Sequence, residues 1–431
     1  AIKPKMIDKL ATFFAHRDKF YGFADSGLLS LFRFACGIAM ARIAGAEGFA
    51  TYILLMSTAV IFQMLPTTLF ITPLLNLGNS GKQDRYVTLY RWAKRGILRA
   101  ALWFSGIGAA GLLLIPQQTL PTATGLSFLA ATSAMLLQQY LRARLQLQFK
   151  QRQALIADGA TITIHIATSL YLWKNGIEAQ TSFWLGACLS CLLGSTLMQY
   201  ALGKTPSSYD DDDEIRNTAT SSGRVMLIGS IANTACSRFQ PYVIGLIAST
   251  TAIAQYGVAW TLIGPIRMLS MALTSLLRPR LSLCCKAHDQ QAFQSLYYRA
   301  LSLISVIGGA GIVTSCFLGE WTIATLFGDE LSSASKLLPL ALLYATLDAL
   351  TTSQMVACQI GNKDGPALTS KLRVHSAIIS LLLLVPMTYT FSLYGTLGSL
   401  IIAELYYALR INQTSHRDGL NNNLLAKQTQ T

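Results

Sequence analysis

Arginine stands inside otherwise apolar stretches at three places in this sequence, Arg33, Arg238 and Arg267. A guanidinium stays protonated in proteins, and at the centre of a membrane helix it costs about 2.5–3.5 kcal/mol. Such residues usually face a bundle interior or a water-filled path. The planar guanidinium donates two parallel hydrogen bonds, which suits phosphate. The three arginines therefore predict a cationic binding site for an anionic ligand.

Acidic and histidine side chains also interrupt the apolar stretches. Asp158 and His165 are two helical turns apart, so they share one face of a helix. Together with Asp25, Asp348 and Glu404, they are candidates to take up a coupling ion, either H+ or Na+. Two structural alternatives remain open at this point. The acids pair with the three arginines, or the polar side chains form hydrogen bonds between helices.

Composition identifies the kind of chain that carries these residues. Of its 431 residues, 52% are hydrophobic and 13% are charged, against about 25% charged in an ordinary soluble domain. About a dozen apolar stretches are each long enough to cross ~30 Å of hydrocarbon, where the backbone must form helices. The predicted spans are 24–44, 49–75, 96–115, 122–141, 154–173, 181–202, 224–248, 256–278, 300–318, 336–360, 367–390 and 395–411.

The loops between these stretches differ in their content of lysine and arginine. Alternate loops are rich in both, and the opposite loops hold only Lys174 and Lys336. By the positive-inside rule, both termini lie in the cytoplasm. The basic loop residues include Arg142, Arg144, Lys150 and Arg152 after the fourth span and Lys363, Lys371 and Arg373 around the start of the eleventh. Because the net charge of +14 is spread over many short loops, it indicates membrane topology and attraction to lipid headgroups rather than nucleic-acid binding.

The two halves of the chain resemble each other weakly. Arg33 precedes Tyr52 at nearly the same spacing as Arg238 precedes Tyr256. This pattern predicts a parallel repeat, with two pseudo-symmetric six-helix lobes around a central cavity. The predicted parts are an amphipathic cytoplasmic leader (1–23), an N-lobe (24–202), a cytoplasmic linker (203–223), a C-lobe (224–411) and a cytoplasmic tail (412–431).

The sequence carries little that would support enzyme chemistry. No metal-ligand cluster, nucleophile elbow or phosphate-cradling glycine loop appears in it. The longest outward loop, 319–335, is too short to hold a catalytic domain. We therefore expect a protein that is not an enzyme, with no catalytic residues, no metal and no cofactor.

Four stretches resemble a known family. They are "RIAGAEGFATY" (42–52), "GPIRMLSMALTSLLRPRLS" (264–282), "LFGDELSSASKLLPLALL" (326–343) and "LYGTLGSLIIAELYYALR" (393–410). With them the chain resembles the multidrug/oligosaccharidyl-lipid/polysaccharide (MOP) exporter superfamily, in its polysaccharide and O-antigen flippase branch. The first stretch keeps the family's residues at Arg42, Gly45, Glu47, Phe49 and Tyr52 and departs from them at Ala46, Gly48 and Ala50.

The resemblance implies a twelve-helix, two-lobe protein that flips an undecaprenyl-diphosphate-linked oligosaccharide across the bacterial inner membrane. It implies O-antigen or other polysaccharide assembly on the far side, with polysaccharide polymerase machinery as a partner. Related flippases hold the diphosphate in a cationic cavity, which agrees with the independent interpretation of the three arginines. The alternatives are a cation-coupled multidrug exporter of the same fold, which should have an acidic cavity, a membrane polymerase or ligase of lipid-linked glycans, and a non-transporting scaffold.

Overall fold

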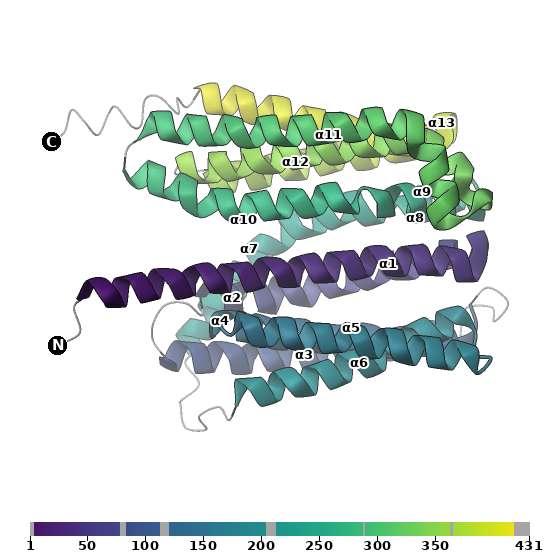
Figure 1. Ribbon diagram of the computed structural model, residues 1–431, viewed down its shortest axis with the longest axis horizontal. Coiled ribbons are helices and arrows are strands. Elements are labelled where there is room, and N and C mark those ends of the chain that lie inside the picture. The colour runs from purple at the N-terminus through teal and green to yellow at the C-terminus, as the bar shows by residue number, and fades with distance from the viewer. Residues whose placement is uncertain are drawn as a thin grey trace. The chain divides into compact units, whose positions relative to one another are not determined.

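The computed structural model describes residues 4–77, 83–112, 120–203, 213–287, 289–362 and 365–417, and every regular element among them is a helix (Figure 1). The chain divides into two compact units. Unit 1 comprises Ala1–Arg33 and Thr58–Ser230, and unit 2 comprises Phe34–Ser57 and Ile231–Thr431. Phe34–Ser57 thus packs with unit 2, although the sequence placed this segment in the N-lobe.

Unit 1 is built around four antiparallel helices: α3 (Gln83–Leu112), α4 (Thr122–Leu147), α5 (Gln151–Lys174) and α6 (Ala179–Leu202). Helix α6 packs along both α4 and α5. Flanking parts of α1 (Pro4–Pro66), the π-helical turn η1 (Thr67–Ile71), α2 (Thr72–Leu77) and the first part of α7 (Asp213–Arg238) complete the unit. Its interior holds large side chains with almost no exposure, among them Tyr140, Trp184 and Met198.

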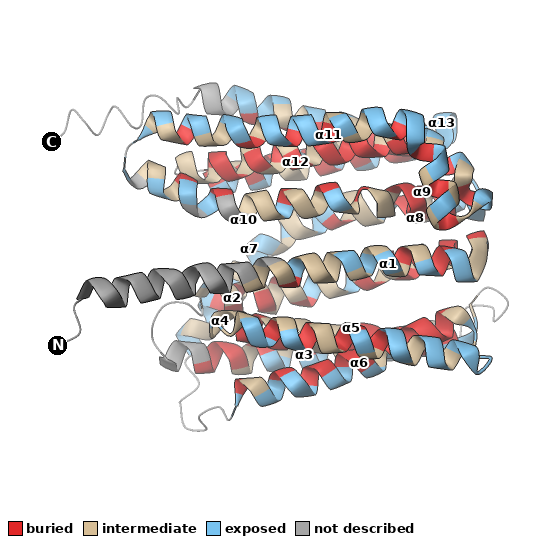
Figure 2. Ribbon diagram, in the orientation of Figure 1, coloured by how far each residue is buried: buried red, intermediate tan, exposed pale blue. Residues whose placement is uncertain are grey.

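Unit 2 begins with three shorter helices, α8 (Gln240–Ile247), α9 (Thr250–Leu262) and α10 (Gly264–Lys286). They are followed by α11 (Gln290–Phe327), the 3-10 turn η2 (Asp329–Leu337), α12 (Leu338–Gly361) and α13 (Gly365–Arg417). Helix α12 packs against α10, α11 and α13. In Figure 2, α12 is largely buried, whereas α11 turns a row of exposed residues outward.

The exposed face of α11 is apolar, with Val306, Val313, Phe317 and Trp321 each more than half exposed. A helix that exposes such residues along its length is suited to face hydrocarbon rather than water. Within the described residues, six helical segments are long and apolar enough to cross a membrane: Ala24–Leu77, Gln151–Lys174, Ala179–Leu202, Thr250–Thr274, Gln290–Phe327 and Gly365–Gln413.

Two of these segments each contain a pair of the predicted spans. The backbone leaves the helical region at Gly45 in α1 (φ 67°) and at Ser392 in α13 (φ 53°). Both positions fall in the short gaps predicted between spans, at 45–48 and 391–394. The remaining predicted spans lie largely on helices, and residues 113–115 of the third span are outside the described residues. The prediction of an all-α polytopic membrane protein with about twelve membrane helices in two lobes is confirmed.

The turn at Gly45 gives structural roles to two residues of the family-like stretch 42–52. Nε of Arg42 donates to the Leu326 carbonyl (3.0 Å), and Nη2 donates to the carbonyls of Ala324 (3.1 Å) and Thr325. These carbonyls lie in the last turn of α11, where that of Ala324 also accepts the Gly328 N–H, whereas those of Thr325 and Leu326 have no helical N–H to bond them. A cation at this end also complements the helix dipole. Arg42 therefore caps a distant helix, and Gly45 allows the sharp turn beside it because it has no side chain.

Parts of the predicted leader, linker and tail lie outside the described residues, namely 1–3, 204–212 and 418–431. The backbone of the leader is helical from Pro4 onward as the first part of α1. The leader's side chains before Tyr21 lie outside the described part of the structure. The amphipathic character of the leader and the boundaries of the predicted parts stay predictions.

Candidate functional site

A cavity of about 460 Å³ lies inside unit 2, between α7, α10, α12 and α13. This volume falls in the range of small-ligand pockets. Charged side chains in its lining come from three arginines, Arg238, Arg267 and Arg373, and two acids, Asp348 and Glu404. The cavity therefore gathers two of the three arginines and two of the five coupling-ion candidates that the sequence indicated.

Arg267 is held in this cavity by aromatic rings. Its Cζ lies 3.8 Å from the centroid of the Trp260 ring and 5.8 Å from that of Tyr344. The Trp260 ring in turn stacks with the rings of Tyr256 and Tyr344, with centroids 5.4 Å and 6.0 Å apart. Cation–π attraction offsets part of the cost of removing a guanidinium from water.

Because aromatic rings hold the Arg267 guanidinium by its face, its N–H groups can still bind a ligand. A ring below the guanidinium face uses none of its in-plane N–H donors. Among the described residues, no side-chain or backbone oxygen accepts a hydrogen bond from Arg267 and no carboxylate pairs with it. The half-buried side chain thus brings a positive charge to the cavity with its terminal nitrogens available.

Arg238 is the last residue of α7 and lies close to the same rings, with Cζ 5.9 Å from the Trp260 centroid. The chain bends at Phe239, and α8 begins at the next residue, Gln240. The fully buried Gln240 side chain fixes this bend. It donates to the Cys236 carbonyl and accepts a hydrogen bond from the Tyr256 hydroxyl. The bend and the aromatic stack are therefore tied together.

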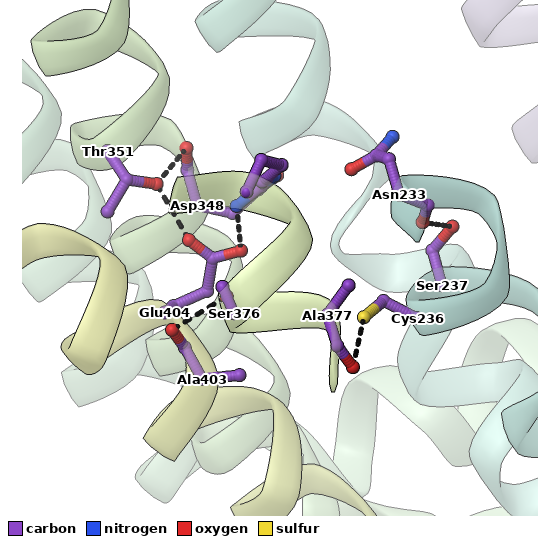
Figure 3. Close-up of polar contacts among 10 residues, drawn as sticks. Asn233, Cys236, Ser237, Asp348, Thr351, Ser376, Ala377, Ala403 and Glu404 are labelled. Carbon is purple, nitrogen blue, oxygen red and sulfur yellow. Dashed lines mark hydrogen bonds and ion pairs between the residues drawn. The ribbon is translucent and has the colours of Figure 1, made fainter. Parts of the chain in front are cut away.

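Arg373 is held differently, by two carboxylates. Nη1 donates to Glu404 at 2.5 Å and Nη2 donates to Asp348 at 3.1 Å, while the Thr351 hydroxyl donates to the other oxygen of Glu404 at 2.8 Å. Figure 3 shows Thr351 beside both acids, with Asn233 and Ser237 on α7 elsewhere in the cavity lining. We call Arg373, Asp348 and Glu404 the unit 2 triad. It carries one excess negative charge if both acids are ionised.

A second triad of the same composition lies in unit 1. Arg142 forms ion pairs with Asp25 and with Asp158, the latter at 3.1 Å between Nε and Oδ2. Gln138 donates to the other oxygen of Asp158 at 3.1 Å. We call Arg142, Asp25 and Asp158 the unit 1 triad. It joins α1, α4 and α5, and both of its acids are almost fully buried.

Two predicted site residues belong neither to a triad nor to the unit 2 cavity. His165 is buried on α5, where its Nε2 lies 3.2 Å from the Phe183 carbonyl and its ring packs against Phe32 and Phe183. Arg33 lies on α1 in unit 1 with its side chain exposed. The structure thus brings Arg238 and Arg267 together in one cavity, and their assigned role in substrate binding stays a prediction, as does that of Arg33.

Sequence reasoning missed Arg142 and Arg373 as partners of the acids. Both were interpreted as loop charges that report topology. A signal was available, since Arg373 falls six residues inside the predicted span 367–390 and Arg142 directly follows the span 122–141. In the structure α4 continues to Leu147 and α13 begins at Gly365, so both arginines lie within helices.

No group of three or more His, Cys, Asp or Glu side chains arranged to hold a metal ion occurs in the part of the chain that the structure describes. The lining of the unit 2 cavity offers guanidinium groups, carboxylates, hydroxyls, an amide and tyrosine rings. Such a set can bind an anion through charge-assisted hydrogen bonds.

Comparison with known proteins identifies the family to which this chain belongs. Residues 95–336 match the model of a family described as "Polysaccharide biosynthesis protein", which is more than half of the chain. No curated protein sequence matches significantly.

Solved structures share the fold at low sequence identity. An inward-facing multidrug resistance MATE family transporter of the MOP superfamily has a TM-score of 0.70 at 14% identity, covering 93% of this chain and 100% of that one. The lipid II flippase MurJ in an inward closed conformation has a TM-score of 0.66 at 13% identity, covering 94% and 87%. A MOP superfamily transporter from Pyrococcus furiosus, described as having a binding pocket of reverse polarity, has a TM-score of 0.61 at 13% identity, covering 93% and 95%.

The match to the family extends over the last part of α3, the whole of α4 to α11 and η2 up to Lys336, and so includes Arg238 and Arg267. The resemblance noted in the sequence is confirmed: this chain belongs to the polysaccharide biosynthesis protein family and has the fold of MOP superfamily exporters.

Proposed function

We propose that this protein is a flippase that moves an undecaprenyl-diphosphate-linked oligosaccharide across the bacterial inner membrane by alternating access. In this proposal the diphosphate binds at Arg238 and Arg267 in the unit 2 cavity, while the role of Arg33 in substrate binding stays a separate prediction. Membership of the polysaccharide biosynthesis family supports the class of substrate. The fold shared with the lipid II flippase MurJ agrees with a lipid-linked substrate.

The observation that carries the proposal is the way Arg267 is held. Its charge is supported by the face of Trp260, and no described residue pairs with its terminal nitrogens. One charge pair at 4 Å gives ~4 kcal/mol at an effective dielectric near 20. This is comparable to the cost of placing one arginine in a membrane helix, so an arriving diphosphate would offset that cost. A cavity with an arginine whose terminal nitrogens are available favours binding of a multiply charged anion.

The same charges disfavour a multidrug exporter, although several solved neighbours are transporters of that kind. A cationic drug needs unpaired acids, and both cavity acids contact Arg373. It would also meet Arg267 at close range. A membrane polymerase or ligase of lipid-linked glycans is the alternative from a different class, and a transport assay separates it from a flippase.

Export of lipid-linked glycan is the measurement that tests this function. We expect Arg267→Ala and Arg238→Ala to reduce flipping in cells or proteoliposomes by at least about tenfold, because each removes a phosphate-binding cation. The protein should stay inserted and abundant. Arg280→Ala, at an exposed position on α10, is the matched control and should leave flipping unchanged.

Arg267→Lys sharpens the test because lysine keeps the charge and loses the planar fork and the stack on Trp260. We expect an intermediate flipping rate. Unimpaired flipping in both alanine variants would refute the proposal, as would export of cationic drugs with no flipping of lipid-linked glycan.

Several predictions stay open beside this proposal. These are the coupling of transport to H+ or Na+ at Asp25, Asp158, His165, Asp348 or Glu404, the cytoplasmic position of both termini, a cavity between the lobes and a polysaccharide polymerase as partner.

A further inference from the structure

The unit 2 cavity has a feature that binding of a diphosphate does not explain. A site for an anion alone would be lined by donors and cations, yet two carboxylates share this cavity with the arginines. A carboxylate repels phosphate, and burying it costs free energy unless it is paired. Arg373 pairs with both acids, but they differ in how completely they are satisfied.

Glu404 has partners on both oxygens, Arg373 on one and Thr351 on the other, and its side chain is only 7% exposed. Asp348 uses one oxygen to accept from Arg373. Its second oxygen accepts no hydrogen bond from any residue that the structure describes, and the side chain is 22% exposed. Asp348 therefore offers an ionic acceptor to whatever occupies the cavity.

Other polar groups on the wall can both donate and accept hydrogen bonds. Thr352 on α12 and Asn233 on α7 line the cavity, and their side chains form no hydrogen bond within the described part of the chain. A hydroxyl or an amide can serve either role, whereas phosphate oxygens only accept at a cationic site. The lining therefore suits a ligand that carries hydroxyl groups as well as negative charge.

The positions of the charged groups suit such a ligand. Arg267 lies 5.8 Å from the Tyr344 ring, and Asp348 follows Tyr344 by one helical turn on the same face of α12. The available cation and the available carboxylate thus both lie near Tyr344 in the lining of the cavity. A sugar ring joined to a phosphate likewise presents hydroxyls and negative charge within one small ligand.

We propose that the unit 2 cavity is a glycosyl-phosphate site, in which Arg267 and Arg238 bind phosphate and Asp348 accepts hydrogen bonds from hydroxyls of the sugar attached to it. Thr352 and Asn233 contact the same sugar. The inference rests on the proposed function, because that function supplies the lipid-linked glycan. It adds that the first sugar, and not only the diphosphate, is recognised by this lobe.

Binding of soluble probes tests the site without any transport. The full-length protein in nanodiscs is titrated calorimetrically with glucose 1-phosphate, N-acetylglucosamine 1-phosphate, inorganic phosphate and glucose. We expect at least one sugar phosphate to bind about tenfold more tightly than inorganic phosphate or glucose, since each added hydrogen bond to a charged group contributes at that scale. If neither sugar phosphate binds more tightly than inorganic phosphate, the assignment is wrong.

Asp348→Ala separates the sugar from the phosphate. We expect it to weaken binding of the preferred sugar phosphate about tenfold and to leave inorganic phosphate unchanged or bound more tightly, because a repelling charge has gone. Arg267→Ala should weaken both probes. Asp329→Ala, at an exposed acid of η2, is the matched control and should change neither.

Two further measurements keep the test decisive. Asp348→Asn keeps the size of the side chain and one acceptor oxygen, so it should retain part of the preference for sugar phosphate. Equal losses of affinity for both probes in the Asp348 variants would show that Asp348 acts only through the structure of the cavity.

A polyprenyl-phosphate-linked monosaccharide in the nanodisc should displace the soluble sugar phosphate, and failure to displace it would exclude the lipid-linked source. Flipping is measured separately, so loss of the proposed function and loss of this site are distinguishable.

Discussion

The two arginine triads have the same composition but different surroundings. In the unit 1 triad, Asp25 and Asp158 are 1% and 2% exposed, and Arg142 joins helices α1, α4 and α5. In the unit 2 triad, Asp348 is 22% exposed and all three members line the cavity. A triad enclosed by helices holds them together, whereas a triad on a cavity wall also presents charge to a ligand.

The comparison also shows two ways of supporting an arginine in a membrane protein. Arg142 and Arg373 each form ion pairs with two carboxylates, so their charge is paired within the protein. Arg267 rests on the face of Trp260, which leaves its donors free for a ligand. An arginine held by carboxylates is therefore chiefly structural, and one held by an aromatic face is suited to binding.

Removing the arginine of each triad should give the largest effect and should separate the two. Arg142→Ala leaves two buried carboxylates without a cation, which costs about 3–5 kcal/mol of folding stability. We expect a clear fall in the midpoint of thermal unfolding in detergent. Arg373→Ala should lower it less, because Asp348 reaches the cavity. Arg152→Ala, at an exposed position on α5, is the control; an equal loss in both triad variants would contradict the distinction.

Removing one acid from each triad should give an intermediate effect. Asp25→Ala deprives the partly buried guanidinium of Arg142 of one partner, and we expect a loss of about 2 kcal/mol. Asp348→Ala should cost less, since water in the cavity screens the remaining charges. Urea titrations that monitor helix content would measure both variants. The expected order is reversed if the unit 2 triad is the one that holds its helices together.

The smallest effect should come from the neutral donor beside each triad. Gln138→Leu removes a hydrogen bond to Asp158, and Thr351→Val removes one to Glu404. Each should cost about 1.5 kcal/mol, the lower end for hydrogen bonds to charged groups. The two losses should be similar, because Asp158 and Glu404 are both well buried. Thermal unfolding of the paired variants checks this, and a large difference would show that one donor has a role beyond its hydrogen bond.

The fold could be predicted almost completely from the sequence. The predicted spans 24–44 and 49–75 are separated at the residues where the backbone turns at Gly45, and the spans 367–390 and 395–411 are separated around Ser392. This agreement has a local cause. A segment must be apolar over about 20 residues to cross the hydrocarbon, and a turn interrupts that pattern wherever it occurs.

The candidate site could be predicted in part. Arg238 and Arg267 stood out because charge is rare inside apolar stretches, and both line the cavity. Arg142 and Arg373 did not stand out, because basic residues near the ends of spans usually report topology. Arg42 stood out only as part of a family-like stretch, and in the structure it caps α11. For these three arginines, the sequence did not show which group each side chain contacts.

The sequence by itself determined where the chain crosses the membrane and which spans carry charge, because the cost of entering hydrocarbon is set within each segment. Tertiary structure alone decided which charges meet. Arg142 pairs with Asp25 from 117 positions away, and Arg373 pairs with Glu404 from 31. Electrostatic pairing depends on distance in space, and helix packing brings together residues whose separation along the chain says nothing about that distance.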